Sequence, residues 1–172
     1  MTKHSEQPGE AKAFQIFRGA EAPPLVITDY QGMTPVISDG LNRLREAGSY
    51  EGADARVLFE IPGFSLTYAS FKSGYALPLH SHGADCLYYV TDGSLKLGTE
   101  HLQKGDGFFV PGNTPYSYIP GSDGVEVIEI RHHGCSDIKF TAKNPAYWDR
   151  TVQGMAEAAA RWQTEKKPES VE

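Results

Sequence analysis

The chain has 172 residues, with 16 lysines and arginines against 22 aspartates and glutamates, so its formal net charge is −6. That length suits one domain whose core needs no disulfide or structural metal, and a net negative chain without a basic run binds nucleic acid and anionic membranes poorly. The 18 glycines and 11 prolines favour short elements joined by turns over a helical bundle. Two cysteines, Cys86 and Cys135, are too few for a disulfide scaffold.

The chain begins with a polar segment, residues 1–13, which we expect to be disordered. This segment lacks the apolar stretch of a secretory signal, and nothing in the chain approaches the ~18 apolar residues of a membrane span. We therefore expect a cytoplasmic protein with reduced thiols.

An N-terminal arm is predicted over residues 14–54. A short apolar, β-branched run after Pro23 and Pro24 predicts a strand over residues 25–28. Residues 41–47 have the pattern of a short helix, with Ser38 or Asp39 as its N-terminal cap and Gly48 at its end.

Residues 55–140 differ from the arm in their pattern of apolar and turn-forming residues, and they are predicted to form one all-β domain. Short aliphatic and aromatic runs recur there between Gly, Pro, Asp and Asn, at a spacing typical of an antiparallel sandwich or barrel. The predicted strands cover residues 55–60, 64–72, 76–80, 86–91, 94–97, 107–110, 116–119 and 125–131.

The hydrophobic period changes near the C-terminus, where Asn144 and Pro145 start a helix predicted over residues 144–166. Its apolar residues form one stripe: Trp148, Val152, Met155, Ala159 and Trp162. Either the barrel or a second subunit must cover this stripe. Because the arm strand is also able to pair with a neighbour's sheet edge, we expect a homodimer.

His80 and His82 are separated by one residue, inside a predicted run of strands. Side chains two apart on a strand point to the same face, so both imidazoles are able to meet one ion. Imidazole suits Fe, Zn, Cu, Ni and Mn. The alternative is a hydrogen-bonded surface pair.

The spacing around these histidines resembles the two sequence motifs of the cupin superfamily. Gly74, five residues, His80-x-His82 and then Gly93 are similar to the first motif, and Gly105, five residues and Pro111 are similar to the second. The resemblance covers about residues 55–131. It implies a single antiparallel cupin-type, jelly-roll-like β-barrel with a metal and substrate pocket inside, flanked by the arm and the C-terminal helix.

The chain departs from the cupin motifs at two ligand positions. Cys86 stands where a glutamate is usual, and Tyr116 stands where a histidine is usual. The resemblance then implies a metal held by His80, His82, Cys86 and Tyr116, with Fe expected and Zn, Ni or Mn as alternatives; the other alternative is a metal-free site. Asp85 lies beside Cys86, but its side chain points to the opposite face of the predicted strand, so it ranks below Cys86 as a ligand. Further candidates for the remaining ligands are Glu126, Glu129, His101, His132 and His133, each of which is otherwise a solvated residue.

Tyrosines gather in the same region. Tyr88 shares its parity with Cys86, and Tyr118 with Tyr116, so all four side chains are able to line one cavity. We expect Tyr116, Cys86 and Tyr88 to be the catalytic residues, because the resemblance implies such a role: some cupin lyases and isomerases use tyrosines as general acids or bases. The alternative is core packing, with Cys86 as a small buried hydrophobic residue.

The resemblance implies a small-molecule metalloenzyme. An oxygenase acting on an aromatic or dicarbonyl compound is the first expectation, with metal-dependent lyase, isomerase or cyclase chemistry close behind. The cysteine is similar to that of thiol dioxygenases, but those enzymes keep the third histidine that Tyr116 replaces here. The alternative from another class is a non-catalytic binding or sensor cupin. The expected partners are a small-molecule substrate and a second copy of the chain, and neither nucleic acid nor membrane.

Overall fold

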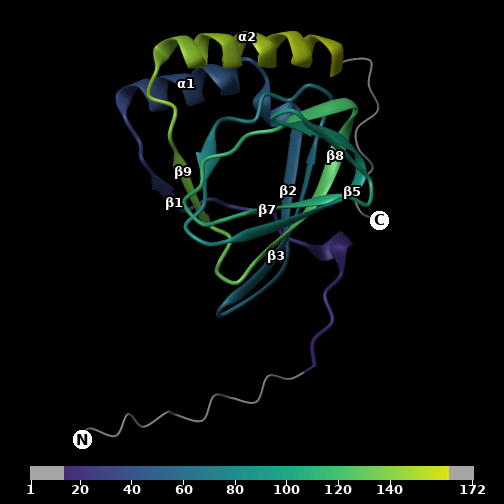
Figure 1. The fold of residues 1–172 in the computed structure, drawn as a ribbon. Coiled ribbons are helices and arrows are strands. Elements are labelled where there is room, and N and C mark those ends of the chain that lie inside the picture. Colours follow the sequence, from purple (N-terminus) through teal and green to yellow (C-terminus); the bar gives the residue numbers. More distant parts are fainter. Residues whose placement is uncertain (1–13, 163–172) are drawn as a thin grey trace, which may run out of the picture.

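The computed structural model describes residues 14–162, which form two β-sheets capped by two α-helices (Figure 1). The larger, six-stranded sheet has the order β2-β3-β8-β5-β6, with β7 also paired to β5. Its strands are β2 (Ala53–Ile61), β3 (Phe64–Phe71), β5 (Cys86–Leu97), β6 (Glu100–Gln103), β7 (Gly107–Val110) and β8 (Ile119–Arg131). All its pairings are antiparallel.

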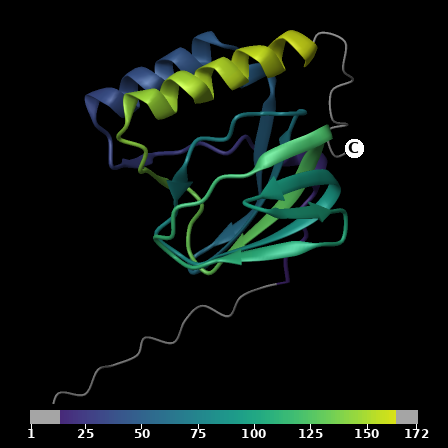
Figure 2. The same cartoon turned by 45° about the horizontal axis from the view of Figure 1, so that its top comes forward.

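The smaller sheet has the order β1-β9-β4. It consists of β1 (Asp29–Gln31), β9 (Asp137–Phe140) and β4 (His80–Ser81), and only the β1–β9 pair is parallel. The helices α1 (Pro35–Glu46) and α2 (Pro145–Trp162) lie side by side across one end of the β-structure (Figure 2). The 3-10 turns Gly19–Glu21 and Ser49–Glu51 complete the described elements. This arrangement confirms the predicted all-β barrel class with a C-terminal helix.

The register of the larger sheet places a polar group of side chains at one end of its inner face. On β8 the inward residues alternate, so Val125 and Val127 are followed by Glu129 and Arg131. On β5 the facing inward residues include Cys86, paired with Arg131, and Tyr88, paired with Glu129. The interior is therefore apolar at one end and polar at the other, beside β4.

Several predicted strand boundaries differ from the structure. Residues 86–91 and 94–97 belong to one strand, β5, because Gly93 takes a φ of 68° and lets the strand bend past Gly124 without a break. Residues 125–131 belong to β8, which begins at Ile119, whereas Tyr116 makes only an isolated bridge to His80. Residues 25–28 form no strand: Pro24 makes one bridge to Arg56, and β1 begins at Asp29.

The predicted start of the first helix is wrong. The helix begins at Pro35, where Thr34 Oγ1 accepts a hydrogen bond from the Ile37 N–H at 3.3 Å, rather than at Ser38 or Asp39. Proline is favoured at the first helical position because its missing N–H would have no partner there.

The apolar stripe of α2 is buried within the chain. Trp148, Met155 and Trp162 are each no more than 3% exposed. Trp148 lies against α1, where a Cβ at Gly40 would overlap its indole ring, and Trp162 Nε1 donates to the Ser73 carbonyl at 2.9 Å. The stripe is therefore not available to a second subunit. The predicted continuation of the helix to residue 166 and the predicted tail over residues 1–13 lie outside the described residues. Among the described helices, none is long and apolar enough to span a membrane.

Candidate active site

His80 and His82 lie at β4, with their ring centroids 5.0 Å apart and both side chains buried. The Nδ1 atom of His80 is 2.7 Å from the carbonyl oxygen of Pro78, and that of His82 is 2.8 Å from the carbonyl oxygen of Asp137. A carbonyl only accepts, so each Nδ1 must carry the ring proton. Both Nε2 atoms are therefore proton acceptors.

Tyr116 is held against His80 by backbone and side chain together. The two residues exchange backbone hydrogen bonds of 3.1 and 2.8 Å, and the Tyr116 hydroxyl lies 3.0 Å from His80 Nε2. Because Nε2 carries no proton, the Tyr116 hydroxyl donates to it. The Tyr88 and Tyr116 hydroxyls are also hydrogen-bonded to each other, and because the Tyr116 proton is directed to His80, Tyr88 is the donor. The result is a directed chain from Tyr88 through Tyr116 to His80.

Burial keeps Tyr88, Tyr116 and His80, the groups of this hydrogen-bond chain, neutral at physiological pH. Burial, with a contribution from His82, lowers the pKa of His80 to about 4. Burial also lowers the pKa of His82. The pKa values of Tyr88 and Tyr116 lie well above 10, because burial and then the negative charge of Glu129 oppose their ionisation. His80 is thus a neutral acceptor and Tyr116 a neutral donor.

A buried charged network borders the histidines. Arg131 is 2% exposed and donates both to Glu129 and to Asp137 Oδ1, the latter at 3.0 Å. Burial opposes the charge of Arg131, but Glu129 outweighs it and raises the pKa of the guanidinium. The Asp137 carboxylate also accepts from the Gly83 N–H at 2.7 Å. Since the Asp137 carbonyl accepts from His82, this network fixes the orientation of the His82 ring.

Cys86 lies next to this network as a thiol. It is buried, its Sγ donates to the Ala84 carbonyl at 3.4 Å, and burial together with Glu129 raises its pKa to about 12. A thiolate, which is the form that binds metal or attacks a substrate, is therefore disfavoured.

The other candidates divide between the inner face and the surface. Glu129 points inward, while Glu126 lies on the opposite face of β8. His101, His132 and His133 are exposed. Asp85 accepts from the Gly112 N–H at 2.8 Å and so holds the turn that precedes Tyr116. Sequence reasoning missed Arg131 and Asp137; the inward parity that Arg131 shares with Glu129 was the one available signal.

The donor set does not fit a resident transition metal as it is arranged. Within residues 14–162, no three His, Cys, Asp or Glu side chains lie close enough together to hold an ion. The Nε2 lone pair of His80 accepts from Tyr116, the Cys86 thiol is protonated, and Glu129 is bound to Arg131. His82 Nε2 alone remains, and one imidazole binds a metal weakly. Binding of the predicted metal would require these side chains to rearrange, and the metal stays a prediction.

Comparison with known proteins finds similarity at the level of fold. No protein-family model matches the chain, and no curated protein matches it. The polyketide cyclase RemF from Streptomyces resistomycificus is similar over 83% of this chain and 99% of its own, with 14% identity and a TM-score of 0.54. A protein of unknown function with a cupin-like fold from Ralstonia eutropha JMP134 is similar over 88% of this chain and 89% of its own, with 21% identity and a TM-score of 0.51.

Both similarities cover more than four fifths of this chain, so they concern its whole arrangement rather than one motif. They agree with the overall arrangement of sheets and helices described above. The chain has the cupin fold.

Proposed function

We propose that this protein is a cupin-type enzyme that performs general acid–base catalysis on a small molecule with a polarised carbonyl, in a lyase, isomerase or cyclase reaction. The observation that carries the proposal is the Tyr116 hydroxyl, which lies between His80 Nε2 and the Tyr88 hydroxyl. A donor and an acceptor of protons are thereby held at one point of a buried site.

The proposed chemistry needs only groups of this chain. His80 Nε2 takes a proton from the carbon next to the substrate carbonyl and becomes an imidazolium, and the Tyr116 hydroxyl turns to donate a hydrogen bond to the enolate oxygen that forms. Burial disfavours this imidazolium and lowers the pKa of His80 to about 4, and the negative charge of Glu129 opposes that effect only in part. Return of the proton to a different carbon gives an isomer, and loss of a leaving group from the β-carbon gives an alkene.

The substrate class follows from the walls of the site. The rings of Tyr88 and Phe108 are stacked, with centroids 4.6 Å apart, and Tyr116 and Tyr118 are stacked beside them. Planar, conjugated molecules pack well on such faces. This favours an aromatic or β-dicarbonyl compound.

A metal-dependent oxygenase acting on the same class of substrate is the second candidate. The observation in its favour is the orientation of both histidines, whose Nδ1–H groups bind backbone carbonyls and direct Nε2 away from them, as in metal-ligating histidines. It requires Tyr116 to leave His80 Nε2 and further ligands to be recruited. A non-catalytic binding cupin is the third reading.

One assay distinguishes these readings without the natural substrate. Exchange of the α-protons of 1,3-diketones and aryl ketones into D₂O is followed by NMR, with and without a chelator. We expect exchange that survives chelation and falls about 10²–10⁴-fold in Tyr116→Phe, while Tyr89→Phe, on the exposed face of the same sheet, behaves as wild type. Bound iron, with oxygen uptake that chelation abolishes, would instead support the oxygenase. Binding without exchange would indicate a binding protein.

A further inference from the structure

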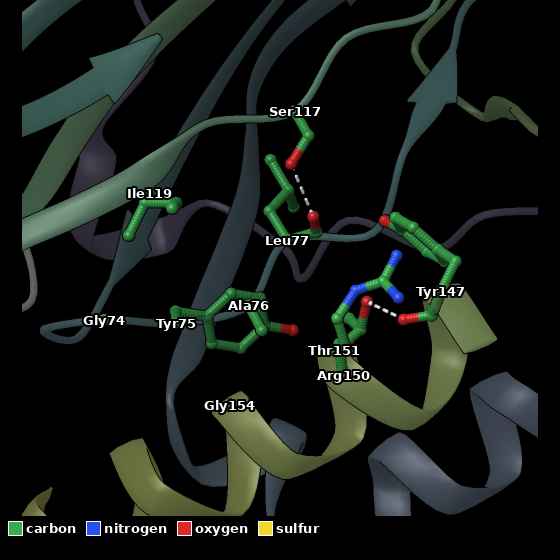
Figure 3. A pocket seen from close by; sticks show the side chains of 10 residues that line it. All are labelled: Gly74, Tyr75, Ala76, Leu77, Ser117, Ile119, Tyr147, Arg150, Thr151 and Gly154. Atoms are coloured by element: carbon green, nitrogen blue, oxygen red, sulfur yellow. Dashed lines mark hydrogen bonds between the residues drawn. The ribbon is translucent and has the colours of Figure 1, made fainter. Parts of the chain in front are cut away.

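A cavity away from the histidines lies between α2 and the segment that leads into β4 (Figure 3). Its volume is about 450 Å³, within the range of small-molecule sites. Ser117 lines it, whereas the preceding residue, Tyr116, points into the barrel, so the two sites lie on opposite sides of one wall. The cavity shares no side chain with the His80–Tyr116 site.

The hydrogen bonds of this cavity leave two donors unused. Ser117 donates its hydroxyl proton to the Leu77 carbonyl at 2.7 Å, and Thr151 donates to the Tyr147 carbonyl at 2.8 Å. The Tyr147 hydroxyl accepts from the Leu79 N–H at 2.7 Å, which leaves its own proton free to donate. The exposed side chain of Arg150 makes no hydrogen bond or ion pair with any residue of the described chain.

Gly154 shapes the floor of the cavity. Glycine is a poor helix former, and this one lies in the interior of α2. Packing does not require it, because a Cβ at this position would meet no heavy atom within 4 Å. The opposite holds at Gly40 in α1, where the indole of Trp148 fills the space. At Gly154 the missing side chain leaves open volume beside Arg150.

We propose that this cavity is a binding site for a small carboxylate with an apolar body. The planar guanidinium of Arg150 matches a carboxylate, and the Tyr147 hydroxyl supplies a further donor on the same face of α2. The apolar body lies against Leu77 and Ile119, over Gly154. The site is independent of the proposed acid–base chemistry, because it uses none of its residues.

The test is isothermal titration calorimetry of the full chain with benzoate and hexanoate, and with the corresponding neutral amides. We expect both carboxylates to bind and both amides to bind at least tenfold more weakly. Arg150→Gln should weaken carboxylate binding at least tenfold, whereas Arg45→Gln, which removes an exposed arginine from α1, should leave it unchanged. Gly154→Leu should abolish binding by filling the cavity.

The variant Tyr116→Phe separates this site from the barrel. Carboxylate binding that persists in Tyr116→Phe and is lost in Arg150→Gln supports the outer site, whatever the result of the exchange assay. Equal binding of acids and amides would overturn the proposal. So would retention of binding in Gly154→Leu, an equal loss in Arg45→Gln, or a loss in Tyr116→Phe without one in Arg150→Gln.

Discussion

Tyr116 changes what a histidine pair at this position does. A histidine in its place would offer a third lone pair to a metal, whereas a phenol offers a proton and occupies the lone pair of His80. With a tyrosine at position 116, the Tyr88 hydroxyl becomes the next donor in the hydrogen-bond chain. At the scale of single residues, the site is therefore organised around proton positions.

The first prediction concerns the buried, neutral His80. Its pKa is about 4, whereas an unfolded histidine titrates near ~6.5. Above pH ~6.5 neither state binds the proton, but as the pH falls towards 4 the unfolded chain binds it and the folded chain does not. The free energy of unfolding should therefore fall by about 3 kcal/mol through this window on account of His80.

Chemical denaturation between pH 7 and pH 4 measures this effect. His80→Gln should flatten the dependence of the unfolding free energy on pH. A slope that is unchanged in His80→Gln would contradict the prediction.

The second prediction concerns the buried pair of Arg131 with Glu129. Arg131→Met leaves the Glu129 and Asp137 carboxylates buried without their partner, which should cost about 3–5 kcal/mol of unfolding free energy. The matched control is Lys104→Met, which removes an exposed partner of Asp92 and should cost less than about 1 kcal/mol. Urea denaturation compares the two, and equal losses would contradict a structural role for Arg131.

Residue identities were predictable to different degrees. The His80–His82 spacing and the alternation of Cys86 and Tyr88 are local, so the sequence indicates their shared direction. The contact of Arg131 with Asp137 depends on how the chain turns between β8 and β9, which no periodicity in the sequence specifies. The engagement of His80 by Tyr116 likewise required the fold, since 36 residues separate them.

The helix pair shows how an element depends on one small residue. Gly40 in α1 admits the ring of Trp148 from α2, and Trp148 Nε1 in turn donates to the Ala142 carbonyl at 2.8 Å. The two helices therefore approach closely where the larger helix begins. Packing, rather than helix propensity, decides what residue 40 is.

The third prediction compares two glycine-to-alanine changes in helices. Gly40→Ala should destabilise the protein by about 1–3 kcal/mol, because its Cβ overlaps Trp148. Gly154→Ala should stabilise it by roughly 0.5–1 kcal/mol, because alanine is the better helix former and the position has room. Thermal unfolding of both variants checks the opposite signs. Two shifts in the same direction would show that propensity or packing alone governs both sites.

Element boundaries were predictable where a local signal dominated. The short apolar run over residues 107–110 matches β7, and Asn144 with Pro145 marks the start of α2. The first helix was predicted too short, because Pro35 was not recognised as its first residue. The predicted strand over residues 76–80 is reduced to His80–Ser81, because Pro78 has no N–H for a ladder and the Leu77 N–H turns back to Tyr75.

At the scale of the whole molecule, the α2 stripe is buried within the chain, so the expected homodimer interface must lie on another surface. The outer face of the larger sheet carries exposed apolar side chains at Leu87, Tyr89 and Phe109, and Leu87 lies opposite Phe109 in the register. Exposed apolar side chains gathered on one sheet face are typical of an interface. We place the predicted contact between two copies on this face.

The fourth prediction is that the protein is a dimer in solution and that Leu87→Lys combined with Tyr89→Lys makes it a monomer. Sedimentation equilibrium at micromolar concentration measures both. The matched control, Phe14→Lys, removes an apolar side chain that is 92% exposed and lies outside this face. A wild-type monomer, or a dimer that survives the double change, would contradict the assignment.

The small sheet has a consequence for the dynamics of the chain. Its strands are two to four residues long, so few hydrogen bonds hold each strand. They also come from three distant parts of the sequence, so closing the long loops between them costs a large conformational entropy. Such a sheet opens locally at a lower free energy than the long ladder of β5 and β8. We expect the amides of His80 and Tyr116 to exchange with solvent faster than those of Val90 and Val127. On that basis the candidate chemistry sits on the part of the fold that is able to open for a substrate while the rest of the barrel remains closed.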